Sequence, residues 1–187
     1  MTNYINVTDK ALVFATTAHN GQVRKATNIS FMIGHVIEVG LLISKMTSNS
    51  KSIDNIATAA GFLHDVVEDT TVTIEEIENE FGPEIANLVL LQSEDKSKTW
   101  QERKDHTMEL LKTNESKQLE ICILADKLSN MRSLAKESSV SEDFWSKFNA
   151  PKEKQKWYYN EIANQMKFVK DLDEYKEYKE LLKKVFA

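Results

Sequence analysis

The chain has 187 residues, 41% of them hydrophobic, which is enough for one domain with a substantial core, and its 24 basic against 29 acidic residues argue against a broad nucleic-acid-binding surface. The five Gly and two Pro together make up about a third of the usual combined Gly and Pro content of ~12%. Because these residues interrupt helices, we expect long helices and an all-α fold. The sequence has no signal-peptide pattern, no apolar run near the ~20 residues of a membrane span and only one cysteine, Cys122, so we expect a cytoplasmic protein. We expect a single domain over residues 1–187 and no membrane or nucleic-acid partner.

The first part of the chain is predicted to form three helices. Thr8 is a suitable N-cap for a helix that ends near His19, where Asn20-Gly21 favours a left-handed termination. A loop over residues 22–30 precedes the second helix, and a polar connection precedes the third. The predicted helices span residues 8–19, 31–46 and 53–67.

The remainder of the chain is also predicted to be helical. Capping boxes begin at Thr73 and at Thr99, each followed three residues later by Glu, and Pro83 suits the first turn of another helix. The segment over residues 138–150 is weakly patterned, and no alternating strand of useful length appears. In chain order, these helices cover residues 73–81, 83–92, 99–112, 115–136, a stretch from Pro151 and a final amphipathic stretch through Val185.

Three of these helices place a polar side chain on an apolar face. His64 shares a helical stripe with Ala57 and Ala60, and His35 shares one with Leu42. Asp126 follows apolar residues by three and four positions, although Asp is almost never fully buried unless it is paired or bound to a metal. Taken alone, any one of them is more simply an ordinary core residue with a hydrogen bond.

Acidic residues gather beside His64. Asp65 follows it directly, and Glu68 and Asp69 lie one turn beyond. Carboxylates near an inward imidazole repel one another, and a divalent cation removes that cost. Two imidazoles and two carboxylates suit Mn²⁺, Fe²⁺, Co²⁺ or Zn²⁺ better than Ca²⁺. His35, His64, Asp65 and Asp126 are therefore candidate ligands of one metal site, and their assignment depends mainly on the family resemblance described next.

Three motifs carry a resemblance to a known family. They are Ala-His-Asn-Gly-Gln-Val-Arg-Lys over residues 18–25, Leu-His-Asp-Val-Val-Glu-Asp-Thr over residues 63–70 and Leu-Ala-Asp-Lys-Leu-Ser-Asn-Met-Arg over residues 124–132. Together they resemble the HD-domain phosphohydrolases and, more closely, the hydrolase domain of RelA/SpoT proteins. A chain of 187 residues has no room for the synthetase domain of those proteins, so the resemblance is to the stand-alone small alarmone hydrolases.

This resemblance implies a helical bundle that holds one Mn²⁺. It implies a guanosine-3′,5′-bis(diphosphate) 3′-pyrophosphohydrolase of the stringent response, which converts ppGpp or pppGpp to GDP or GTP and pyrophosphate. Glu68 and Asp69 match the catalytic pair of the family, placed to take the proton of the attacking water and to orient it.

The resemblance also implies substrate contacts by six residues, each of which has a plainer alternative as a solvated or surface side chain. Arg24 and Lys25 match the pair at the nucleotide, and Arg103 and Lys104 match a basic pair near the pyrophosphate. Asn130 and Arg132 match positions that contact ribose and phosphates. The aromatic run over residues 157–159 is interpreted as packing, and His19 and His106 as structural or exposed.

One departure affects substrate choice. The family pattern Pro-Tyr-x-x-His-Pro around the first metal histidine is replaced by Ser-Phe-Met-Ile-Gly-His-Val over residues 30–36. The tyrosine hydroxyl is lost, which affects purine or ribose selection. Two alternatives therefore stay open: an HD-domain phosphohydrolase that acts on an adenine alarmone or NADPH, and an inert helical regulatory protein. The sequence does not determine the oligomeric state.

Overall fold

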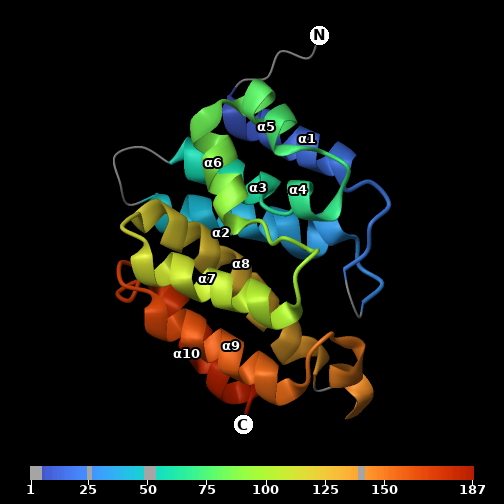
Figure 1. Cartoon of the computed structure of the whole chain (residues 1–187), viewed down its shortest axis with the longest axis vertical. Helices are drawn as coiled ribbons and strands as arrows, with labels where there is room; N and C mark the ends of the chain where they lie inside the picture. The colour runs from blue at the N-terminus through green and yellow to red at the C-terminus, as the bar shows by residue number, and fades with distance from the viewer. Residues whose placement is uncertain (1–5, 25–26, 49–53, 139–141) are drawn as a thin grey trace. The chain divides into compact units, whose positions relative to one another are not determined.

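The protein is described by a computed structural model that covers residues 6–24, 27–48, 54–138 and 142–187. The predicted all-α fold is confirmed: within these ranges every named element is a helix, and the only extended pairing is an isolated bridge between Val23 and Ser30 (Figure 1). None of these helices combines the length and the hydrophobicity needed to cross a bilayer. The chain divides into two compact units, residues 1–94 and 95–187, and a single domain over residues 1–187 stays a prediction.

The first unit is built around helix α3, whose residues from Ala57 to Leu63 are all buried. Helices α1, α2 and α6 pack against it, and α5 packs against α6. The elements of this unit are α1 (Val7–Ala18), the π-helix η1 (Met32–Val36), α2 (Ile37–Thr47), α3 (Asn55–Leu63), α4 (Val66–Asp69), α5 (Ile74–Phe81) and α6 (Pro83–Gln92).

Two glycines allow α2 and α3 to pack closely. A Cβ atom on Gly61 would lie 3.6 Å from the Cα atom of Gly40 and 2.3 Å from Cδ1 of Ile43. A Cβ atom on Gly40 would lie 2.1 Å from the ring of Phe62. Side chains at these positions would therefore force the helices apart, because cores pack at crystal-like density. The close contact holds the end of α3, and with it His64, beside α2.

Local sequence signals give most helix starts correctly and two boundaries incorrectly. The capping boxes at Thr73 and Thr99 are both present, and Pro83 opens α6 after Gly82, which has a φ of 87°. The first helix is capped by Asn6, whose side chain accepts the N–H of Asp9 at 2.9 Å, so the predicted Thr8 cap is wrong. The predicted third helix does not run to residue 67, because α3 ends at Leu63; its predicted start, residue 53, lies outside the described residues.

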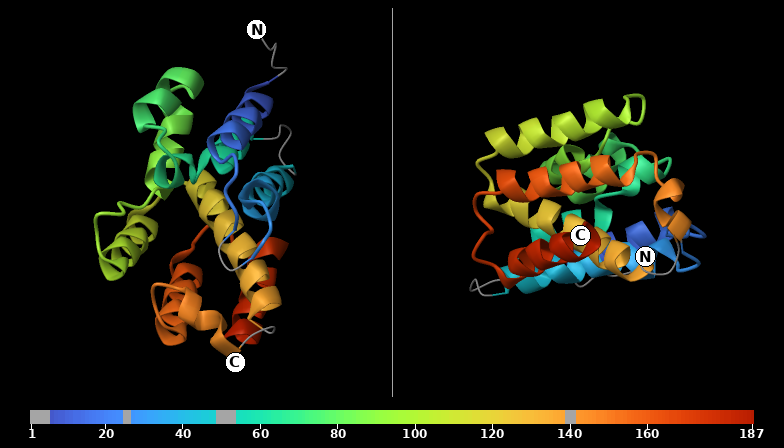
Figure 2. Two further views of the ribbon diagram at one scale, coloured as in Figure 1. Left: turned by 90° about the vertical axis from the view of Figure 1, so that its right-hand side faces the viewer. Right: turned by 90° about the horizontal axis from the view of Figure 1, so that it is seen from below.

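The second unit contains four α-helices in its described residues, and a six-residue 3₁₀-helix lies in the weakly patterned segment. Helix α10 packs on both α8 and α9, and α7 packs on α9; α8 and α10 run side by side in the left view of Figure 2. The elements are α7 (Trp100–Thr113), α8 (Lys117–Glu137), η2 (Glu142–Lys147), α9 (Lys152–Gln165) and α10 (Asp173–Val185).

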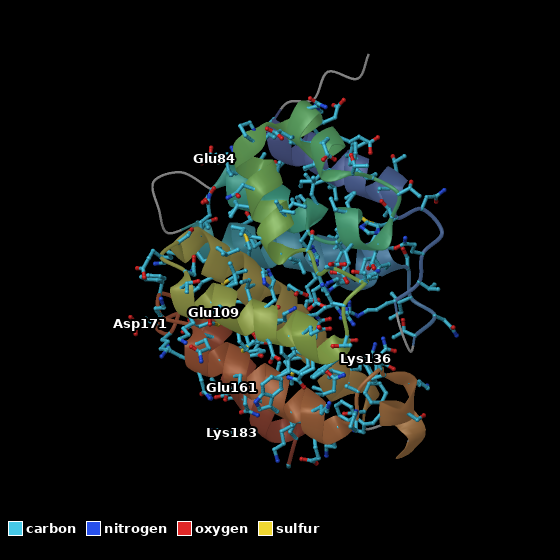
Figure 3. The ribbon with its side chains drawn as sticks, viewed as in Figure 1. Glu84, Glu109, Lys136, Glu161, Asp171 and Lys183 are labelled. Carbon is cyan, nitrogen blue, oxygen red and sulfur yellow. The ribbon has the colours of Figure 1, made fainter. Side chains whose placement is uncertain are left out.

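One acidic side chain of α8 is part of the core. Charged residues such as Glu109 and Lys183 project from the surface of the second unit (Figure 3), whereas Glu120 is 0% exposed. Its carboxylate accepts the backbone N–H groups of Lys167 and Phe168 at 2.7–2.9 Å. A buried charge is tolerated when hydrogen bonds satisfy it, so Glu120 fixes the connection between α9 and α10 onto α8.

Candidate active site

The His64-Asp65 pair lies at a break in the helix. Helix α3 ends at Leu63 and the short helix α4 starts at Val66, with Asp65 between them at φ −97° and ψ −4°. This break brings Oδ2 of Asp65 to 3.0 Å from Nε2 of His64. The His64 side chain is 3% exposed and that of Asp65 is 21% exposed. Two adjacent residues, which an unbroken helix would point about 100° apart, thus direct their polar atoms to one point.

His35 reaches the same point from the π-helix η1. The N–H of Ile37 bonds to the carbonyl oxygen of Met32, five residues earlier, which is the π-helical pattern. The side chain of Ile33 is exposed, while His35 is buried. Nε2 of His35 lies 3.1 Å from Nε2 of His64 and 3.4 Å from Oδ2 of Asp65. Three of the four predicted ligands are therefore together within the first unit.

The arrangement of donor atoms fits a bound cation. The carbonyl oxygen of Gly61, 2.8 Å from Nδ1 of His64, can only accept, so Nδ1 carries the hydrogen and Nε2 of the neutral ring presents a lone pair. That lone pair faces a carboxylate oxygen and a second imidazole nitrogen. Donor separations of 3.0–3.4 Å match those of neighbouring ligands that each lie about 2.1 Å from a shared ion.

The electrostatics of Asp65 agree with this arrangement. Burial raises the pKa of the Asp65 carboxyl, but without an ion the positive charge of His64 and hydrogen bonds from the Nε2–H groups of both histidines outweigh burial and hold that pKa well below its ordinary value. A bound cation would take the place of those hydrogens, and Nε2 of each ring would then present its lone pair. Asp65 is therefore a carboxylate at neutral pH, which is the form that binds a metal ion.

Glu68 and Asp69 lie on the one-turn helix α4 that follows the His-Asp pair. Burial, and next the negative charge of Asp65, raise the pKa of Glu68 to about 7, although its Oε2 accepts the backbone N–H of Glu94 at 3.1 Å. Asp69 is exposed, and its backbone carbonyl accepts a hydrogen bond from the Gln22 amide at 2.8 Å. A carboxyl group that titrates near neutral pH can both accept and donate a proton.

Arg24 is the one predicted substrate residue of the first unit that the structure describes, since Lys25 lies outside the described residues. Arg24 is only 8% exposed, so the alternative of a solvated surface side chain is wrong for it. Its Cδ atom would lie 3.3 Å from a Cβ atom on Gly34, so the arginine packs against the π-helix that carries His35.

In the second unit, Asp126 lies on α8 within a polar group. Its carboxylate accepts from the Nζ atom of Lys127 and the Nδ2 atom of Asn130, each at 2.6 Å. Asn130 is therefore beside Asp126, as its position four residues later predicted. A metal-binding role for Asp126 stays a prediction.

The other basic residues of the second unit have distinct surroundings. The ammonium of Lys104 lies 4.6 Å from the ring centre of Tyr158 and 5.9 Å from that of Trp100, which are cation–π distances. Arg132 makes two hydrogen bonds of 2.7 Å to the Glu177 carboxylate and so joins α8 to α10. Arg103 is half-buried on α7.

Comparison with known proteins identifies the family of this chain. The family model described as an HD domain matches residues 11–150. The chain belongs to the HD-domain family. The Drosophila melanogaster protein named guanosine-3′,5′-bis(diphosphate) 3′-pyrophosphohydrolase MESH1 is 36% identical over 125 residues, which cover 67% of this chain and 68% of that protein.

Two solved structures resemble this HD-domain chain over most of its length. One, described as a metazoan ortholog of SpoT that hydrolyses ppGpp, superposes with a TM-score of 0.79 at 25% identity and covers 98% of this chain and 97% of that one. The other, from Listeria monocytogenes, has a TM-score of 0.67 at 34% identity over 80% of this chain and 96% of its own. The resemblance found in the sequence is confirmed.

The spacing before His35 differs from the RelA/SpoT pattern that the sequence resembles, and a π-helix lies there. The family pattern has two residues between Tyr and His, whereas three residues separate Phe31 from His35. The π-helix accommodates one residue more per turn than an α-helix, which fits this extra residue. Counting the spacing would have revealed it.

Proposed function

We propose that this chain is a metal-dependent phosphohydrolase that removes the 3′-pyrophosphate of ppGpp and pppGpp. The observation that carries the proposal is the convergence of His35, His64 and Asp65 one helical turn before Glu68, whose pKa is raised to about 7. The names of its relatives support it, since MESH1 is named as this pyrophosphohydrolase and the metazoan SpoT ortholog is described as hydrolysing ppGpp.

The proposed metal is Mn²⁺, held by His35, His64, Asp65 and, on the strength of its sequence motif, Asp126. The mixture of nitrogen and oxygen donors suits such an ion, and the Gly61 carbonyl orients His64 as a supporting hydrogen-bond acceptor. When bound, an ion of this kind polarises a phosphoryl oxygen and lowers the pKa of water.

The proposed role of Glu68 is proton transfer, and that of Asp69 is orientation of the attacking water. Glu68 takes a proton from water as the water oxygen bonds to the phosphorus next to the ribose. The bond between that phosphorus and the 3′ oxygen breaks, and the ribose oxygen takes up a proton. The products are GDP or GTP and pyrophosphate. In the metal-free protein, burial and the charge of Asp65 raise the pKa of Glu68 to about 7, so this carboxylate is a stronger proton acceptor than an ordinary glutamate.

Six residues are proposed to hold the nucleotide. Arg24 packs against the π-helix of His35, and Asn130 lies beside Asp126, so both belong to groups that contain proposed ligands. The Lys104 ammonium lies over the ring of Tyr158, and Arg132 is hydrogen-bonded to Glu177. The full proposed set is Arg24, Lys25, Arg103, Lys104, Asn130 and Arg132.

A second candidate function has one observation in its favour. Phe31, whose ring centre lies 5.4 Å from that of His35, has no hydroxyl where the family pattern has Tyr. Because loss of that hydroxyl affects purine or ribose selection, the alternative substrate is an adenine alarmone or NADPH. An inert regulatory protein is disfavoured, because three metal donors and a carboxyl group with a raised pKa are kept together. A cytoplasmic location and a role in the stringent response stay predictions.

A substrate panel tests this proposal. The purified protein is incubated with ppGpp, pppGpp, the adenine analogue and NADPH, each with Mn²⁺, with Mg²⁺ and with a chelator, and products are separated by chromatography. We expect GDP or GTP plus pyrophosphate with Mn²⁺ and none with the chelator. Preferential turnover of the adenine analogue or NADPH would support the second candidate, and no turnover of any substrate would overturn both.

A further inference from the structure

Gln22, in the connection after α1, contacts three separate segments of the first unit. Its Nε2 lies 2.8 Å from the backbone carbonyl oxygen of Asp69, and its Oε1 lies 2.8 Å from Nδ1 of His19. Its own carbonyl oxygen accepts the N–H of Phe31 at 2.9 Å. The Gln22 side chain thus joins His19, at the end of α1, to Asp69, at the end of α4. The Gln22 backbone bonds to Phe31, the residue before the π-helix.

The orientation of this amide is determined by its partners. The carbonyl oxygen of Asp69 can only accept, so the NH₂ group of Gln22 must face it and Oε1 must face His19. His19 therefore donates from Nδ1. His19 is 1% exposed and its ring centre lies 5.1 Å from that of Phe31, so the imidazole is held by packing. Gln22 cannot rotate its amide without breaking two hydrogen bonds.

The receiving carbonyl belongs to a helix that needs outside support. Helix α4 has only four residues, and a single turn is unstable by itself because helix nucleation is costly. Its last carbonyl groups have no partner within the helix. Gln22 supplies the partner for the carbonyl of Asp69, the residue that ends α4 and directly follows Glu68.

We propose that Gln22, oriented by His19, is a positioning residue that holds α4 and thereby the carboxylates of Glu68 and Asp69 in their working directions. The inference rests on the proposed function for its catalytic consequence. The same contacts reach the π-helix, because the Phe31 ring packs between His19 and His35, at 5.1 and 5.4 Å between ring centres. Proton transfer depends on the direction of Glu68, whereas metal binding by His35, His64 and Asp65 does not use Gln22.

The test uses the isosteric change Gln22→Glu, which keeps an acceptor for His19 and removes the donor to Asp69. Hydrogen exchange of the Asp69 and Thr70 amides, measured in the metal-free protein, should become about tenfold faster, as expected for one lost hydrogen bond. With Mn²⁺, kcat for ppGpp should fall about 10- to 100-fold while KM and bound metal stay close to wild type. Asn160→Asp makes the same amide-to-acid change where Asn160 bonds a backbone carbonyl on α9, and should change none of these quantities.

Variants at His19 test the second half of the inference. His19→Asn places an amide N–H where Nδ1 lies and should keep the exchange rate and kcat, whereas His19→Phe removes the donor and should behave like Gln22→Glu. Unchanged Asp69 and Thr70 exchange in both Gln22→Glu and His19→Phe would overturn the proposal. If Gln22→Glu does not fold, Gln22→Met replaces it. The exchange rates of its Asp69 and Thr70 amides are then divided by those of the α8 amides and compared with the same ratio in the wild type. Absence of ppGpp turnover in the wild type would overturn the proposed function alone, because exchange still reports on α4.

Discussion

The imidazole of His64 donates its Nδ1 hydrogen to the carbonyl oxygen of Gly61, three residues earlier, at 2.8 Å. This bond uses a carbonyl at the end of α3 to select the ring tautomer, so the lone pair of Nε2 points at Asp65 and His35. The same glycine lets α3 approach α2 at Gly40. One residue therefore sets both the position and the protonation of the central histidine.

Asp65→Ala is expected to abolish metal binding. The change removes the carboxylate that lies 3.0 and 3.4 Å from the two Nε2 atoms, and the two imidazoles and the proposed ligand Asp126 that are left hold a divalent ion far more weakly. Metal analysis of the purified protein should show less than about a tenth of the wild-type content, in line with the loss of a charged ligand. His106→Ala, at an exposed histidine of α7, is the control and should retain full metal content.

Glu68→Gln is expected to separate metal binding from turnover. The amide keeps the shape of the side chain but cannot accept a proton, so kcat should fall by about 10²–10⁴, the usual contribution of a general acid or base. Bound Mn²⁺ should stay at the wild-type level, since Glu68 is not among the converging donors. Wild-type turnover in this variant would remove Glu68 from its proposed role.

The raised pKa of Glu68 predicts a pH dependence of stability in the metal-free protein. The folded state holds a proton on Glu68 up to a pH of about 7, whereas the unfolded state releases it near the ordinary pKa of 4.5. The contribution of Glu68 to the free energy of unfolding is therefore fully present below pH 4.5. It is lost as the pH rises to 7, which lowers the free energy of unfolding by about 1–3 kcal/mol. Urea unfolding of wild type and Glu68→Gln at pH 5 and pH 7.5 measures it.

The difference between the two proteins isolates Glu68 from other groups. Asp65 acts in the opposite direction, because its lowered pKa adds stability that is lost only as the pH falls below its ordinary value of 3.8. A wild-type protein whose stability relative to Glu68→Gln is the same at both pH values would contradict the expectation. Added Mn²⁺ should reduce the difference, because a nearby cation favours the charged form of Glu68.

Arg132 and Glu177 provide a test of the proposed nucleotide contact. Arg132→Ala should raise KM for ppGpp about tenfold, the effect of losing one charge-assisted hydrogen bond. Glu177→Gln should raise KM less, because it loosens Arg132 without removing it. Both changes should lower the free energy of unfolding by less than about 1 kcal/mol, since the pair is partly exposed. Equal losses of stability with unchanged KM in both variants would assign Arg132 a purely structural role.

The features that the sequence predicted well depend on neighbours in the chain. The capping boxes at Thr73 and Thr99 close within four residues, and the inward faces of His35 and His64 follow from helical periodicity. The first helix start was misplaced because Asn6 and Thr8 are both good caps, and only geometry shows that Asn6 accepts the N–H of Asp9.

The features that were missed depend on contacts between distant residues. No Gly or Pro at His64-Asp65 indicates a helix break in the sequence, so the break is seen only in the structure. Gln22 was named only as part of a motif, because its partner at Asp69 lies 47 residues away. Distances between the Nε2 atoms of His35 and His64 likewise require coordinates.

The π-helix has a consequence for how this protein can change over generations. Ile33 in this widened turn is 70% exposed, so its side chain adds almost nothing to the interior. Deletion or insertion of one residue here would rotate the residues before α2 about the helix axis relative to α2, while α2 itself keeps its packing. The surroundings of His35, a proposed metal ligand, can thus be changed by one insertion or deletion, whereas a point substitution at Ile33 would only exchange one solvent-facing side chain for another.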